Sequence, residues 1–275
     1  MNKIGAIIVV RRDTDIFLEM KKVKDVGCEC CQINIWDSSL FTDAVAEKII
    51  EASEKYEIEI STLWVGWSGP TEWNFTAGPV LLGIVPPAYR MKRTEEILKG
   101  ADFAVKLGVP RIATHAGFLP ENISDPNYYP VVAALRYIAR ECKKRGICFL
   151  FETGQETPVT LMRVIEEIGE ECVGINMDTA NLILYGKGNS ADAITVFGKY
   201  VMDTHIKDGF YPTSGKELGR QVKVGEGMAN IPEVVKRLRA VGYTGNYVIE
   251  REISGEEQLK DIKETVEYLK NILEK

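Results

Sequence analysis

The sequence predicts an α/β protein with one domain, a single (β/α)8 TIM barrel over residues 1–275. Short apolar runs rich in β-branched residues alternate with longer amphipathic segments along the whole chain. This strict alternation is typical of a parallel barrel. The runs are nearly continuous in apolar character, as expected of strands covered on both faces. The first predicted turn, 9–13, contains no glycine, which disfavours the rival doubly wound nucleotide-binding sheet.

Eight strand–helix units account for the chain in order. The predicted strands are 3–10, 30–36, 57–64, 111–115, 147–153, 173–178, 200–206 and 246–251. The predicted helices are 14–26, 42–56, 89–107, 127–145, 157–169, 191–197, 231–241 and 256–274. Glycine stands where five helices should end in a left-handed residue, at Gly27, Gly108, Gly146, Gly169 and Gly242. The residues 230–233, Asn-Ile-Pro-Glu, predict an N-cap with a capping box for the helix 231–241.

One segment, 65–88, interrupts this rhythm and is rich in Trp, Gly and Pro. Loops of this length are uncommon in a compact domain unless they serve a function. Trp67, Trp73 and Phe75 would give the segment rigid apolar surface. We favour a lid over the mouth of the barrel, and the alternative is a packed surface excursion.

Composition limits the partners of the chain. Asp and Glu number 40 against 34 Lys and Arg, a net charge of −6, which disfavours a duplex nucleic-acid partner. No run approaches the 18 apolar residues of a membrane span, and the first residues lack a signal-peptide pattern. We therefore expect a cytoplasmic, enzyme-sized protein with no membrane partner.

The six cysteines fit no metal-binding pattern. Cys28, Cys30 and Cys31 cluster but have no facing pair at zinc-site spacing, and the chain has two histidines. Cys148 and Cys172 lie in apolar, strand-like runs. We expect all six to be structural, with the last two acting as small buried apolar residues.

Polar residues stand at the ends of five consecutive predicted strands, where catalytic groups of such barrels gather. They are His115, Glu152, Asp178, His205 and Glu250. An acid or histidine at the end of an apolar run is costly unless it is paired or binds a cation. The last four supply three carboxylates and one imidazole, a set that suits Mn²⁺, Mg²⁺ or Co²⁺ better than a structural zinc. The alternative is a set of ion pairs with Lys207, Arg251 and Arg220.

Several motifs, taken together and in this order, resemble the xylose-isomerase-like TIM barrels, with the D-tagatose 3-epimerase type the most similar group. They are THAG (114–117), FETGQETP (151–158), GINMDTANLILYG (174–186), THIKDG (204–209), VGEG (224–227) and YVIE (247–250). The resemblance extends over essentially the whole chain.

The resemblance implies that Glu152, Asp178, His205 and Glu250 hold one divalent ion, with Mn²⁺ favoured. It also implies that Glu152 and Glu250 form the acid/base pair of an epimerase or isomerase. The substrate would be a keto sugar or sugar acid, and the proton would move through a metal-stabilised cis-enediolate. Such an ion acts as a Lewis acid on the carbonyl, and two opposed bases suit inversion at carbon.

The substrate shell departs from the pattern of the epimerases. Asn181 stands where they have His, Tyr211 where they have Arg, and Pro158 where they have Glu. Glu156 is the nearest acid to the last position, and Arg220 on the following loop can replace the arginine. We therefore expect substrate contacts from His115, Glu156, Asn181 and Arg220, although His115 also suits a structural role.

The same residues suit other functions to different degrees. A metal-dependent dehydratase of a keto-cyclitol or related sugar derivative is the main alternative, since the same enolate can expel water. A repair endonuclease of this fold needs a histidine-rich three-zinc site, which two histidines cannot build. A sugar-binding module fits the metal set poorly. Glu226 disfavours a phosphorylated sugar, whereas Lys207 and Arg251 keep one open. A homo-oligomer is a further option.

Overall fold

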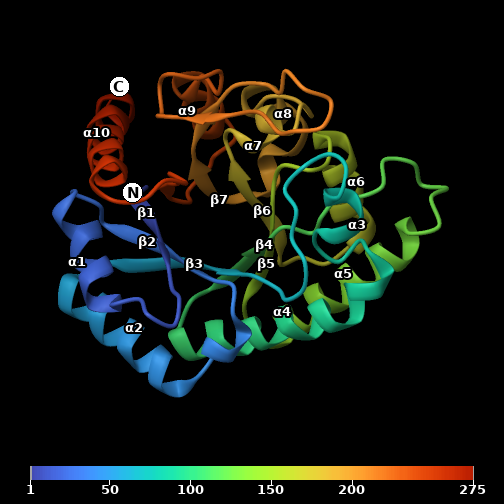
Figure 1. Cartoon of the computed structure of the whole chain (residues 1–275), viewed down its shortest axis with the longest axis horizontal. Coiled ribbons are helices and arrows are strands. Elements are labelled where there is room, and N and C mark those ends of the chain that lie inside the picture. The colour runs from blue at the N-terminus through green and yellow to red at the C-terminus, as the bar shows by residue number, and fades with distance from the viewer. Residues whose placement is uncertain (1, 275) are drawn as a thin grey trace.

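Eight parallel strands close into a barrel and helices surround it in the computed structural model, which describes residues 2–274 (Figure 1). The order around the barrel is β1-β10-β7-β6-β5-β4-β3-β2, and all eight pairings are parallel. The predicted (β/α)8 barrel is therefore confirmed.

The elements follow the predicted units closely. The barrel strands are β1 (Ile4–Val9), β2 (Cys30–Ile35), β3 (Glu59–Val65), β4 (Arg111–Thr114), β5 (Cys148–Glu152), β6 (Val173–Asp178), β7 (Val201–Ile206) and β10 (Tyr247–Ile249). The long helices are α1 (Ile16–Asp25), α2 (Asp43–Tyr56), α4 (Pro87–Leu107), α5 (Tyr128–Lys144), α6 (Pro158–Ile168), α8 (Ser190–Phe197), α9 (Ile231–Ala240) and α10 (Glu256–Leu273). Among the described residues, no helix is both long and apolar enough to cross a membrane.

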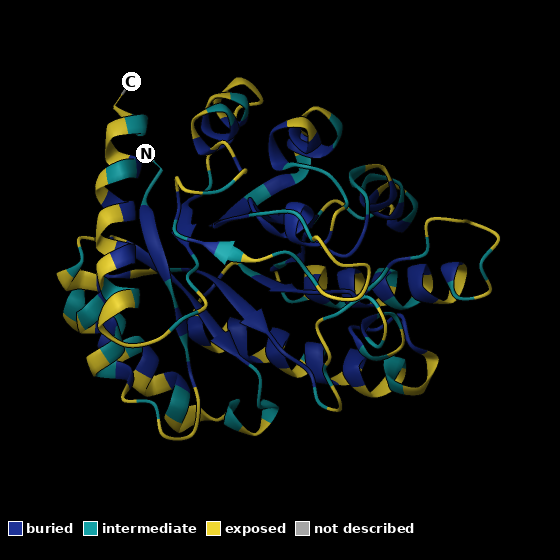
Figure 2. Ribbon diagram, turned by 45° about the horizontal axis from the view of Figure 1, so that its top comes forward, coloured by how far each residue is buried: buried dark blue, intermediate teal, exposed yellow. Residues whose placement is uncertain are grey.

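Burial explains why these segments take these forms. Every residue of β2 and β6 is buried, as a strand between barrel interior and helical layer requires. The helices instead bury one stripe; in α5 it contains Val131, Leu135 and Ile138, spaced at roughly one helical turn. Figure 2 shows the result, with buried strands inside and helices whose exposed faces point outward.

The helix ends confirm the predicted glycine stops, whereas the capping box predicted at one helix start is absent. All five predicted glycines have a positive φ, from +66° to +89°, so the predicted left-handed stops are confirmed. The capping box at Asn230 is wrong. Asn230 has a left-handed backbone (φ 51°) and its side chain caps nothing, because a side-chain cap needs an extended backbone at that position. Glu233 instead pairs with Arg237 at 2.8 Å.

Small elements that the pattern did not predict lie in the loops, all at the mouth except the 3-10 turn Gly198–Tyr200, which directly precedes β7. They are α3 (Gly78–Leu81), α7 (Asn181–Leu184), two 3-10 turns (Ser38–Leu40 and Gly198–Tyr200) and an antiparallel pair, β8 (Asp208–Gly209) with β9 (Gln221–Val222). The Asp208 carboxylate accepts N–H bonds from Gly225, Gly227 and Ala229 at 2.9–3.0 Å. A Cβ on Gly227 would lie 2.2 Å from Asp208 Oδ1. The VGEG motif therefore closes around a carboxylate of its own chain.

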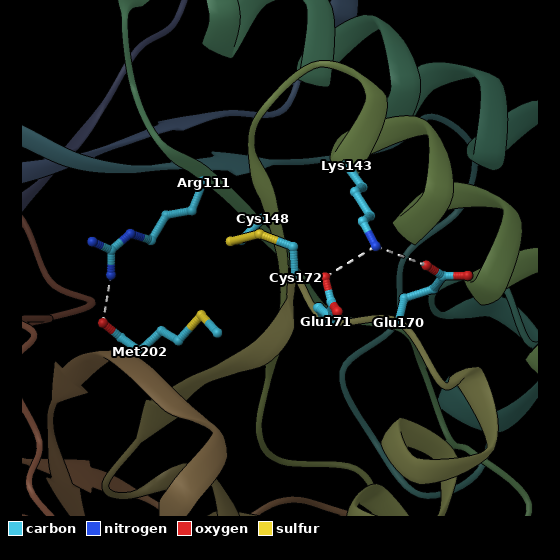
Figure 3. Close-up of a disulfide and its surroundings, with 7 residues drawn as sticks. All are labelled: Arg111, Lys143, Cys148, Glu170, Glu171, Cys172 and Met202. Carbon is cyan, nitrogen blue, oxygen red and sulfur yellow. Dashed lines mark hydrogen bonds and ion pairs between the residues drawn. A yellow bond between two sulfur atoms is a disulfide. The ribbon is translucent and has the colours of Figure 1, made fainter.

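The expectation for two cysteines is wrong. Cys148, at the start of β5, and Cys172, just before β6, form a disulfide (Figure 3). The two strands are neighbours, so residues 24 positions apart come within a Cα–Cα distance of 4.6 Å. The other four cysteines are buried thiols. Disulfides are rare in the cytosol of mesophiles, so this bond does not support the expected cytoplasmic location, which stays a prediction.

Candidate metal centre

Four barrel strands bring polar side chains to one point at their carboxyl-terminal ends. Glu152 ends β5, Asp178 ends β6, His205 is near the end of β7, and Glu250 directly follows β10. One ligand atom from each of the four lies within 4.8 Å of the others. The sequence places these residues far apart, and closure of the barrel gathers them into a candidate site for one metal ion.

The His205 imidazole lies at the centre of this group. Its Nδ1 is 3.0 Å from Glu152 Oε1, 3.4 Å from Glu250 Oε2 and 4.0 Å from Asp178 Oδ2. Burial opposes charge on the imidazole, but the attraction of the two glutamates outweighs it and raises the pKa of His205. A proton on Nδ1 thus occupies the place that a cation would take.

Asp178 provides a direct test of whether the residues fit a metal ion. Its Oδ1 accepts bonds from the N–H groups of Ala180 and Asn181, both at 2.7 Å. Its Oδ2 is buried and has no hydrogen-bond partner, and burial raises the pKa of the carboxyl. A buried carboxylate oxygen without a hydrogen bond is unfavourable; its nearest ammonium, that of Lys207, lies 3.6 Å away, and a bound divalent cation would remove the remaining cost. The residues therefore fit a divalent ion held by oxygen and one imidazole.

The other nitrogen of His205 faces an amide from the opposite side of the barrel. Nε2 lies 2.8 Å from Gln32 Oε1, and Gln32 Nε2 donates to Asn176 Oδ1 at 2.9 Å. Gln32 and Asn176 are both fully buried. Because the Gln32 amide donates to Asn176, its oxygen is left to accept the Nε2 proton. This arrangement leaves the Nδ1 lone pair of neutral His205 free for a metal ion.

Lys207 is a buried cation beside the carboxylates. Its Nζ lies 3.2 Å from Glu250 Oε2, 3.6 Å from Asp178 Oδ2 and 2.9 Å from Glu252 Oε1. Burial disfavours the ammonium, but these acids outweigh burial and raise the pKa of Lys207. Three ligand carboxylates, one ammonium and one divalent cation would sum to zero charge. Lys207 thus complements a metal ion and does not by itself neutralise the site.

The alternative to a metal site was a set of ion pairs with Lys207, Arg251 and Arg220. Of these three cations, Lys207 alone contacts the four side chains of the candidate metal centre. Arg251 pairs with Asp261 at 2.8 Å. Arg220 is exposed and lies over the Phe210 ring at 5.4 Å. Neither arginine therefore forms an ion pair with the four side chains.

A cavity of about 1040 Å³ opens above the site. Glu152, Glu250, Lys207, His115 and Asn181 line it, whereas Glu156 and Arg220 do not. The barrel thus brings together two of the four residues expected to contact substrate.

His115 and Asn181 both reach Glu152 from the cavity wall. His115 Nε2 lies 3.4 Å from Glu152 Oε2, and its Nδ1 has no partner. Asn181 Nδ2 donates to Glu152 Oε1 at 3.3 Å, and its Oδ1 accepts from Lys207 at 3.3 Å. These two side chains can orient Glu152 and a substrate hydroxyl at the same time.

Glu156 is buried in the loop after β5, behind the cavity wall. Its Oε1 receives a long bond of 3.4 Å from the N–H of Gly154. Burial raises the pKa of Glu156 to about 8. The carboxyl therefore keeps its proton at neutral pH.

Tryptophans from three segments form one wall of the cavity. The Trp36 ring lies 4.8 Å from Trp64, 5.4 Å from Trp67 and 6.2 Å from Trp73. Trp36, Trp64 and Trp73 line the cavity, and Trp64 Nε1 donates to Glu152 Oε2. Trp67 is buried behind them. The tryptophan-rich sequence of the loop was the signal for this wall.

Arg93 on α4 anchors the loop 66–86, a role that sequence reasoning missed because helical arginines usually face solvent. Its side chain is fully buried, and its guanidinium lies 4.1 Å from the Trp67 ring. The guanidinium donates to four loop carbonyls at 2.5–3.2 Å, those of Ser68, Pro70, Leu81 and Gly83. The loop is thus tied down beside the cavity, and its role as a lid stays a prediction.

The comparisons with known proteins agree with this architecture. Residues 20–272 match the family model of the xylose isomerase-like TIM barrel. The chain belongs to this family, which confirms the resemblance that its motifs predicted.

Three known proteins illustrate what the chain is similar to. A xylose isomerase domain protein from Planctomyces limnophilus is 28% identical with a TM-score of 0.90, covering 97% of this chain and 96% of that one. A D-tagatose 3-epimerase-like protein shares 20% identity and a TM-score of 0.74, with coverage of 99% and 97%, and shows the shared fold. An uncharacterized protein of Methanocaldococcus jannaschii is 25% identical over 66% of this chain; the match spans 63% of that protein's length.

Proposed function

We propose that the protein is a divalent-metal-dependent epimerase or isomerase of a keto sugar or sugar acid. The observation that carries the proposal is the group of Glu152, Asp178, His205 and Glu250, of which the two glutamates line one cavity. The family, and the fold shared with a D-tagatose 3-epimerase-like protein, support the same class of reaction.

Glu152, Asp178, His205 and Glu250 would hold the ion. When bound, the ion would polarise the substrate carbonyl and stabilise negative charge on its oxygen. Mn²⁺ is the ion we favour, and Mg²⁺ or Co²⁺ would suit the same donors.

Glu152 and Glu250 would move the proton. They come from β5 and β10, three places apart around the barrel, so they can approach a bound sugar from different sides. One glutamate, as a carboxylate, takes the proton from the carbon beside the carbonyl, and the other, in its acid form, gives its proton to the opposite face, so that the two exchange protonation states in one turnover. Burial raises the pKa of Glu250, but Lys207 and His205 outweigh burial and lower it, so Glu250 is ionised and ready to act as the base.

His115 and Asn181 would position the sugar, since both line the cavity and touch Glu152. The tryptophan wall would exclude water from the carboxylates, and this desolvation opposes the lowering of their pKa by the neighbouring cations. Glu156 and Arg220 lie outside the cavity wall, so we assign neither a contact with substrate.

Deuterium exchange tests this proposal. The Mn²⁺-loaded protein is incubated with a panel of ketoses in D₂O, and deuterium at C3 and the new epimer are measured by NMR. We expect exchange in the wild type and at least a thousandfold loss in Glu250→Gln. Glu171→Gln is a matched control at the other end of the barrel, where Glu171 is 90% exposed beside Lys143 (Figure 3). Full exchange in Glu250→Gln would reject the two-glutamate mechanism, and a product absorbing as a diketone would indicate the dehydratase.

A further inference from the structure

The cavity is much larger than the sugar that its floor would bind. Its volume is about 1040 Å³, whereas a six-carbon sugar fills roughly 200 Å³ at the packing density of protein interiors. Ligand pockets usually enclose most of the ligand they serve. If the proposed function is correct, a free monosaccharide at the metal centre would leave most of this space to water.

The additional space lies on one side of the barrel. Beyond the metal centre, the cavity continues between the first turns of α1 and the loop that leads into α10. Figure 1 shows these two helices on the same side of the molecule. Asp13, Leu18 and Lys22 line one wall of this extension and Ser254 and Gln258 the other. We call this part of the cavity the outer groove.

The charged side chains of the outer groove are acidic in excess, and two of its cations are paired with acids. Lys22 forms an ion pair with Glu19 at 2.6 Å, and Arg251 pairs with Asp261 at 2.8 Å. Arg11 also lines the groove without an ion pair to any described residue, but Asp13, Asp15, Glu19 and Glu252 line it as well, so acids outnumber the three cations and disfavour a phosphate or carboxylate group. The groove therefore suits an uncharged ligand rich in hydroxyl groups.

Leu18 adds an apolar contact to this polar surface. Its side chain is 48% exposed on α1 and faces the groove. A sugar ring has an apolar face of C–H groups and a rim of hydroxyls, which matches a leucine flanked by carboxylate, ammonium and amide groups. Burial of exposed apolar surface and hydrogen bonds to the rim would both favour binding.

We propose that the outer groove is a subsite for a second, uncharged glycosyl unit, so that the preferred substrate is a glycosylated keto sugar. The keto-bearing unit occupies the metal centre and the attached sugar lies between α1 and α10. This inference rests on the proposed function, and it excludes a free or phosphorylated monosaccharide as the preferred substrate.

Three matched ketoses test the inference in the Mn²⁺-loaded wild-type protein. D-fructose, 6-O-glucosyl-D-fructose and D-fructose 6-phosphate share one keto unit and a free C3 and differ at O6. We expect kcat/KM for deuterium exchange at C3 to be at least tenfold higher for the glucosylated sugar than for the other two. Rates within twofold of each other, or a preference for the phosphate, would overturn the inference. So would exchange of free ketoses without exchange of the glucosylated one.

Variants that fill the groove provide the second arm. Leu18→Trp should reduce the preference for the glucosylated sugar to less than threefold, and Ser254→Trp, from the opposite wall, repeats the test. Val105→Trp is the control, because Val105 on α4 is equally exposed (47%) and lies outside the cavity. An undiminished preference in both groove variants, with melting temperatures near that of the wild type, would contradict the subsite. Absence of exchange with every ketose would instead contradict the proposed function.

Discussion

Removal of the disulfide should destabilise the protein without altering its chemistry. Cys148 and Cys172 lie at the amino-terminal ends of β5 and β6, whereas Glu152 and Asp178 end the same strands at the opposite side of the barrel. The bond links residues 24 positions apart. A loop of this size lowers the entropy of the unfolded chain, which stabilises the folded protein by about 3.5 kcal/mol. For a chain of 275 residues, this corresponds to a fall in Tm of about 6 °C.

The assay compares the wild type with the double variant Cys148→Ser/Cys172→Ser by urea unfolding and calorimetry. The wild type under reductant should match the variant, and deuterium exchange should stay within twofold. Thiol titration of the unfolded, unreduced chain should give four thiols, the number of free cysteines, and six after reduction. Six thiols before reduction, or a loss below about 1 kcal/mol, would refute the reasoning.

The remaining predictions concern the site and its supports. Gln32→Met should weaken Mn²⁺ binding about 10- to 100-fold in a chelator competition, because His205 loses the acceptor that orients it; Gln32→Glu keeps an acceptor and should bind within threefold of the wild type. The raised pKa of Glu156, about 8, means that the unfolded chain releases this proton at lower pH than the folded protein. The free energy of unfolding should therefore fall between about pH 5 and 8, less steeply in Glu156→Gln by urea titration, and equal slopes would contradict this. Arg93→Lys keeps the charge but cannot serve four carbonyls, so limited proteolysis should cut within 66–86 at least tenfold faster than in the wild type.

The sequence by itself was sufficient to predict the barrel and the four residues of the candidate metal centre. Alternation of strands and helices depends on local patterns of apolar residues, and glycines such as Gly108 end helices for local reasons of backbone conformation. A polar residue at the end of a buried strand is also visible locally, as at Glu152 and Asp178. Parallel strands then bring such positions to one end of the barrel, whatever the details of packing.

Only the tertiary structure decided which side chains support that centre. Gln32 and His205 are 173 positions apart in the chain, and Lys207 meets Glu250 across 43 positions. The disulfide and the loop contacts of Arg93 likewise depend on neighbours that no local pattern specifies. Glu156, near the candidate centre in sequence, is turned behind the cavity wall. The physical reason is that a strand's period fixes which residues face inward, whereas contacts across the barrel depend on how distant segments pack in three dimensions.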